Sequence, residues 1–140
     1  MAILVPDVGE VELLKRMLYS NSGSENGSLR LFKNNVTPAE SDTASTFTVA
    51  DFTGYSNLTL TSSQSGSTWA VPTTSSGTTS STYGTNMGPL TNSGGSAQTV
   101  YGAYCVGATS GTLWFSDLFS AARTLNPSDS ITYTPRIELA

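Results

Sequence analysis

Residues 99–119 read TVYGAYCVGATSGTLWFSDLF, and this stretch decides the expected fold. Residues 99–106 and 112–119 are rich in β-branched and aromatic side chains, while GATSG at 107–111 is typical of a turn. Two such runs around a short glycine-containing segment predict a β-hairpin. Strict alternation in the second strand predicts two faces, one carrying Trp114, Ser116 and Leu118 and the other carrying Leu113, Phe115 and Asp117.

Further strand-like runs lie on both sides of this hairpin. They cover residues 29–33, 46–51, 55–61, 67–71 and 131–139. The last run alternates over nine residues, and its Pro135 predicts an edge strand or a bulge because proline cannot donate to a ladder. Short strands separated by Gly, Pro and Asn turns predict a mainly β single domain over residues 1–140, an antiparallel β-sandwich or jelly roll.

One amphipathic α-helix is expected near the N-terminus, over about residues 7–19. Asp7 and Glu10 have the spacing of a capping box. Apolar residues then recur three or four positions apart, which indicates one buried stripe. This stripe includes Val8, Val11, Leu14 and Leu18.

Residues 73–96 form a Ser/Thr/Gly-rich stretch whose only large apolar side chains are Tyr83, Met87 and Leu90. A structureless loop of this length is unusual in a compact domain. Two interpretations remain open. Part of the stretch is a weak strand, or the stretch is a flexible arm that reaches a neighbouring molecule.

The composition excludes several classes of protein. Serine and threonine make up 43 of the 140 residues, charged residues only 11%, and histidine is absent. Without histidine the commonest general base and metal ligand are missing. A net charge of −4 disfavours nucleic-acid binding. The apolar runs are too short for a secretory signal or a membrane span, so we expect neither.

No residue pattern points to catalysis, and we assign no catalytic residue, metal or cofactor. Cys105 lies within a predicted strand and is read as a small buried apolar residue rather than a nucleophile. A hydrolase would need paired carboxylates, but Glu10 and Glu12 diverge on a helix, and Asp42 and Asp51 can meet only through the fold. The loop around Asp42 is oxygen-rich but lacks EF-hand spacing, so a solvated loop is preferred to a calcium site.

The aromatic residues allow two interpretations. Exposed aromatics on a β-sheet face can stack against sugars, whereas inward aromatics fill a core. We favour the core for Trp69 and Trp114 and leave Tyr83 open as a contact at a subunit interface. Tyr101 and Tyr104 are the other candidates for a sugar-binding platform.

Five segments together resemble a family of small virion structural proteins of tailed bacteriophages. They are MAILVPDVGEVELLKRML at 1–18, LRLFKNNVTP at 29–38, FTGYSNLTL at 52–60, the hairpin at 99–119, and ITYTPRIEL at 131–139. The resemblance implies a capsid decoration, or cement, protein that forms β-rich trimers on the outer capsid lattice. The chain departs from the family pattern at 83–90, where YGTNMGPL replaces an apolar alternation.

The resemblance also implies partners and a location. The major capsid protein is the expected partner, in a virion assembled in the bacterial cytoplasm, with neither nucleic acid nor membrane bound. The candidate capsid or subunit interface consists of Val11, Leu14, Leu18, Tyr83, Met87 and Leu90. The alternative function is a tail, neck or baseplate adhesin or fibre component that binds host-surface glycan.

Overall fold

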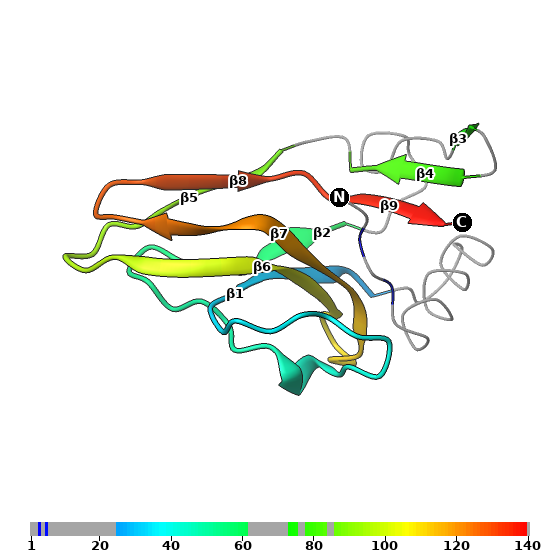
Figure 1. Ribbon diagram of the computed structural model, residues 1–140, viewed down its shortest axis with the longest axis horizontal. Coiled ribbons are helices and arrows are strands. Elements are labelled where there is room, and N and C mark those ends of the chain that lie inside the picture. Colours follow the sequence, from blue (N-terminus) through cyan, green and yellow to red (C-terminus); the bar gives the residue numbers. More distant parts are fainter. Residues whose placement is uncertain are drawn as a thin grey trace.

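The computed structural model describes residues 3, 5, 25–61, 73–75, 78–83 and 86–139 (Figure 1). The described part is mainly β and all its strand pairs are antiparallel, which confirms the predicted fold class at this level. The expected helix at 7–19 and the expected strand at 67–71 lie outside the described residues. The elements are β1 (Gly27–Phe32), η1 (Ala44–Thr46), β2 (Leu58–Leu60), β3 (Thr73–Ser75), β4 (Thr78–Thr82), β5 (Met87–Thr91), β6 (Gln98–Gly107), β7 (Leu113–Leu125), β8 (Ser130–Tyr133) and β9 (Arg136–Leu139).

A four-stranded sheet with the order β2-β1-β6-β7 forms the larger part of the fold. β6 and β7 are the two strands of the predicted hairpin, with Cys105 opposite Phe115. β1 lies between β2 and β6, so that Leu29 has Leu58 on one side and Cys105 on the other. The hairpin prediction is therefore confirmed, although β7 runs on to Leu125 instead of ending at residue 119.

The predicted faces of β7 are wrong at its start because the ladder contains a bulge. Cys105 is paired with Phe115 but the next residue, Val106, is paired with Leu113, which leaves Trp114 as an extra residue on β7. A bulge reverses the side to which the following side chains point. Trp114 and Phe115 therefore pack in the same core cluster, and Leu113 packs on the opposite face.

Two smaller antiparallel sheets lie beside the four-stranded sheet (Figure 1). β3, β4 and β9 form one of them, in that order, and β5 pairs with β8 to form the other. The single strand predicted at 131–139 is therefore wrong, because the chain leaves the ladder at Pro135 and resumes as β9. The main-chain N–H of Tyr83 donates to the Pro135 oxygen at 2.8 Å and bridges this break. In the Ser/Thr-rich stretch, the structure agrees with the strand alternative for the residues it describes, since β3, β4 and β5 all lie there.

Two apolar clusters cover the two faces of the four-stranded sheet. The larger cluster lies between this sheet and the two smaller sheets, and it includes Leu29, Leu31, Ala103, Phe115, Met87, Leu90 and Ile137. The smaller cluster consists of Phe32, Phe47, Tyr104, Val106 and Leu113. Because Leu31 and Phe32 are neighbours in β1 and enter different clusters, the alternation predicted for residues 29–33 is confirmed.

The strand predicted at 46–51 is reduced to one isolated bridge, between Phe32 and Val49. Hydrogen bonds of 2.8 Å from Lys33 N to Thr48 O and from Ala50 N to Leu31 O hold this bridge. The η1 turn directly before it bends the chain, so only Phe47 reaches the smaller cluster. Val49 is left exposed on the outside.

Candidate functional site

Three of the expected interface residues belong to the core of the chain itself. Tyr83, Met87 and Leu90 are exposed by only 7%, 8% and 6%, and all three join the larger apolar cluster. Packing within one chain accounts for their burial. Val11, Leu14 and Leu18, the other three expected interface residues, lie outside the described residues. The interface role of all six stays a prediction.

The clearest surface feature is a band of hydroxyl groups at one end of the molecule. It lies where β5 leads into β6 and where β7 leads into β8, at the left of Figure 1. We define this band, the hydroxyl rim, as Thr91, Ser93, Ser96, Thr99, Thr124, Ser128 and Ser130. All of these side chains are exposed except that of Thr99, which is half-buried.

Cross-strand pairs order part of this rim. The Thr99 and Thr124 hydroxyls lie 2.9 Å apart across β6 and β7, and those of Thr91 and Ser130 lie 2.7 Å apart across β5 and β8. One hydroxyl of each pair donates and the other accepts. A hydroxyl has one hydrogen and two lone pairs, so each still has capacity for a ligand or water. The rim can therefore make direct and water-bridged hydrogen bonds to a polar surface.

A buried asparagine holds the two turns of the rim together. Asn92 is fully buried, and its side-chain amide donates to the main-chain oxygens of Ser96 and Leu125, each at 2.9 Å. Its side-chain oxygen accepts from Gly94 N at 3.0 Å. Sequence reasoning missed this residue because Asn92 lies in the stretch interpreted as a weak strand or arm. The only local signal is the Asn-Ser-Gly-Gly sequence, which is typical of a turn.

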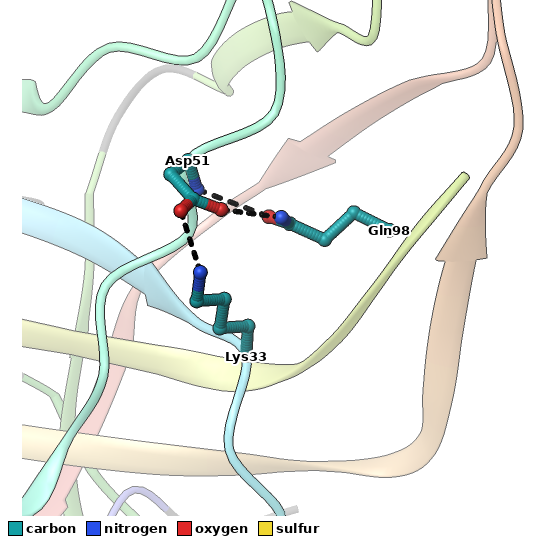
Figure 2. A network of polar contacts seen from close by, with 3 residues as sticks. All are labelled: Lys33, Asp51 and Gln98. Atoms are coloured by element: carbon teal, nitrogen blue, oxygen red, sulfur yellow. Dashed lines mark hydrogen bonds and ion pairs between the residues drawn. The ribbon is translucent and has the colours of Figure 1, made fainter. Parts of the chain in front are cut away.

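A second polar network lies next to the rim at the start of β6 (Figure 2). The Lys33 ammonium group lies 2.6 Å from one oxygen of Asp51, and the Gln98 side-chain amide donates to the other oxygen at 2.5 Å. Asp51 N donates in turn to the side-chain oxygen of Gln98 at 3.0 Å. The hydrogen bond from Lys33, assisted by that from Gln98, lowers the pKa of the Asp51 carboxyl. These contacts connect Asp51, in the loop between β1 and β2, to Gln98, the first residue of β6.

These contacts do not bring Asp42 and Asp51 together as a catalytic pair. Asp42 accepts hydrogen bonds from Ala39 N at 2.7 Å and from the Thr46 hydroxyl at 3.3 Å, both within its own loop. Asp51 has different partners, Lys33 and Gln98. Asp42 thus caps a turn. Among the described residues, no group of three or more His, Cys, Asp or Glu side chains lies close enough together to hold a metal ion.

The described aromatic residues point inward or are partly covered. Tyr83, Tyr104 and Trp114 are buried, and Tyr101 is half-buried against the smaller cluster. Trp69 lies outside the described residues. The described part of the chain therefore presents no exposed aromatic ring for stacking on a sugar.

Cys105 is fully buried in the larger cluster, with its sulfur 3.8 Å from the main-chain oxygen of Val106. This placement agrees with the interpretation of Cys105 as a small apolar residue. In the described residues, no helix has both the length and the apolar character needed to cross a membrane.

Comparison with known proteins found no relative of this chain. No protein-family model and no curated protein matches it. The resemblance of the five sequence segments to virion proteins therefore stays a prediction.

Proposed function

We propose that this chain is a non-enzymatic virion structural protein that binds the outer capsid lattice as a decoration protein and stabilises the head. Its partner is the major capsid protein, and it acts as a homotrimer. The resemblance of the five sequence segments motivates the class of protein. The single structural observation that supports it is the hydroxyl rim, an ordered polar surface on a β-sheet framework.

The rim suits contact with a repeating protein surface. Its cross-strand hydroxyl pairs and the buried Asn92 hold the donors and acceptors in place before binding, so fewer side chains must be ordered on contact. Low charge avoids repulsion from a protein shell, and hydroxyls accept bridging waters readily. We place the capsid contact at this rim.

The proposal also covers the arrangement of the sheets and the packing of the trimer. We propose that the four-stranded sheet forms one layer of a jelly-roll-like sandwich and that the two smaller sheets form the other. The apolar stripe of Val11, Leu14 and Leu18 packs in the trimer, as the spacing of these residues suggests.

The copy number per virion tests this function first. Quantitative mass spectrometry of purified particles, calibrated against the major capsid protein, should give near-equimolar copies. A few to a few dozen copies would overturn the decoration function and favour a neck, tail or fibre component. Light scattering of the purified chain should give a trimer, and a monomer even at high concentration would contradict that part.

A matched pair of variants tests the contact surface. Ser96→Lys adds a long charged side chain to the rim, while Thr37→Lys makes the same change at an exposed site between β1 and η1. Capsids lacking the protein should bind Thr37→Lys as well as wild type and should bind Ser96→Lys at least about tenfold more weakly. Equal binding of both variants would place the contact elsewhere.

A further inference from the structure

Among the residues that the structure describes, one carboxyl group lies inside the core. Asp117 is on β7, opposite Ala103 of β6, and only 7% of the residue is exposed. Neighbours on this side of the sheet belong to the larger apolar cluster, among them Ala103, Cys105 and Phe115. Ionised carboxylates are rarely buried without a partner, because they lose the solvation of water.

The contact made by Asp117 joins the two parts of the fold. Tyr133 is on β8, and its hydroxyl donates to Oδ2 of Asp117 at 3.0 Å. The Tyr133 ring also packs at 5.9 Å from the ring of Phe119. β7 belongs to the four-stranded sheet and β8 to the two-stranded sheet with β5. The hydrogen bond between Tyr133 and Asp117 therefore crosses the core from one sheet to the other.

Within the described part of the chain, the second carboxyl oxygen of Asp117 lacks a partner that would offset its loss of solvation. Oδ1 is buried and has no hydrogen-bond partner among the residues that the structure describes. The described ion pairs are Lys33–Asp51 and Arg136–Glu138, so no basic side chain of the described residues neutralises Asp117. Among the described residues, the group that influences the carboxyl is the Tyr133 phenol. The Cys105 thiol acts on Tyr133.

The balance of these influences favours the neutral acid. Burial raises the pKa of the Asp117 carboxyl above its ordinary 3.8, and the hydrogen bond from Tyr133 offsets this only in part. Burial and the nearby Asp117 also raise the pKa of the Tyr133 phenol, which therefore stays a donor.

We propose that Asp117 is a proton-binding site that couples acidification to the stability of the joint between the four-stranded sheet and the β5–β8 pair. The unfolded chain releases this proton at a lower pH than the folded chain does. The folded state is therefore favoured as the pH falls from neutrality through the folded pKa, and the effect is complete below 3.8. The inference concerns the fold and does not depend on the proposed function.

Asp117→Asn is the direct test, and Asp51→Asn is its matched control. Thermal unfolding of the full chain is followed by circular dichroism from pH 7 to pH 4. The melting temperature of wild type should rise relative to that of Asp117→Asn as the pH falls from 7 to 4, because only wild type gains the stabilising proton. Asp51→Asn should keep this rise, because the pKa of Asp51 is lowered and most of its contribution is lost below the unfolded value of 3.8.

A second measurement keeps the proposal testable if Asp117→Asn fails to fold. The carboxyl carbon of Asp117 in wild type is titrated by nuclear magnetic resonance, and the same is done in Tyr133→Phe. We expect a pKa above 3.8 in wild type and a higher value in Tyr133→Phe, because the tyrosine hydrogen bond lowers it. A carboxyl that titrates at or below 3.8, or an unchanged acid response in Asp117→Asn, would overturn the proposal.

Discussion

The side-chain amide of Asn92 donates a 2.9 Å hydrogen bond to the main-chain oxygen of Leu125, and this bond closes the rim end of the protein. Leu125 is the last residue of β7, whereas Asn92 directly follows β5. The Asn92 main chain also accepts from Ser128 N at 2.7 Å and donates to Asp129 O at 2.9 Å. One residue therefore satisfies the polar groups of two turns and of a strand end.

Asn92→Ala should lower the free energy of unfolding by about 2–4 kcal/mol, because it leaves several buried polar groups without a partner. Urea denaturation followed by circular dichroism measures this. Asn35→Ala removes an exposed asparagine and should change stability by less than about 0.5 kcal/mol. Equal effects in the two variants would contradict the role of Asn92. Asn92→Asp should also destabilise, because a carboxylate would face the carbonyl oxygens of Ser96 and Leu125.

Gly102→Ala tests the close packing of β6. A Cβ at this position would lie 2.1 Å from the main-chain oxygen of Asp117 and 2.5 Å from the ring of Phe32. The backbone oxygen cannot move aside freely, so we expect a loss of roughly 3 kcal/mol in unfolding free energy. Gly95→Ala is the control, because no atom lies within 4 Å of its added Cβ. Unfolding of both variants at the same urea concentration would contradict the close packing of Asp117 and Phe32 against Gly102.

Tyr55→Phe tests a side chain that completes the β1 ladder. The Tyr55 hydroxyl accepts from Leu31 N at 3.1 Å and donates to Asn57 at 3.1 Å. Its removal leaves a strand N–H without an acceptor and should cost about 1–3 kcal/mol. Tyr101→Phe removes a hydroxyl from a half-buried tyrosine on β6 and serves as the control. A smaller loss in Tyr55→Phe than in Tyr101→Phe would contradict the assignment.

The burial of Tyr55 also predicts how the stability of the protein changes at alkaline pH. Burial raises the pKa of Tyr55 to about 12, against an ordinary value of 10.0. A raised pKa means that the contribution to stability is complete below pH 10 and is lost as the pH rises through 12. Ultraviolet difference titration of wild type should contain a tyrosine transition near 12 that Tyr55→Phe lacks. An unchanged titration curve in the variant would count against the burial of Tyr55.

Glu25→Gln tests how the β6–β7 turn is held. The Glu25 carboxylate accepts from Thr109 N at 2.5 Å and from the N–H of Ser110 at 2.8 Å. A neutral amide is a weaker acceptor, so hydrogen exchange at these two amides should accelerate by about tenfold, the equivalent of roughly 1.4 kcal/mol. Glu40→Gln, at an exposed position, should leave both rates unchanged. Unchanged exchange rates at both amides in Glu25→Gln would show that the Glu25 carboxylate does not stabilise the turn.

The sequence predicted those elements whose pattern is local. Alternation at 29–33 and the β-rich runs around GATSG identify β1, β6 and β7, because local propensity and burial agree there. The faces at Trp114 could not be predicted, since a bulge depends on the partner strand. Alternation also runs through Pro135, where the structure separates β8 from β9. Pattern alone does not reveal which partner each half of such a run pairs with.

The polar contacts were less accessible to prediction. Asn92 and Asp117 are buried polar residues whose partners lie 33 and 16 positions away in the sequence. Neither position stands out locally, because an asparagine in a Ser/Gly-rich stretch and an aspartate in an alternating strand look like ordinary surface residues. Their roles arise only when distant segments meet.

The central position of β1 sets the order in which the chain can fold during synthesis. Leu29 is paired with Cys105, which the ribosome adds much later. At a synthesis rate of about 5–20 residues per second, roughly 4–15 s pass between the addition of Leu29 and that of Cys105. During this time the apolar side chains of β1 have no β6 to pack against. β7 follows still later, in the last third of the chain. β1 therefore gains its β6 partner only late in translation.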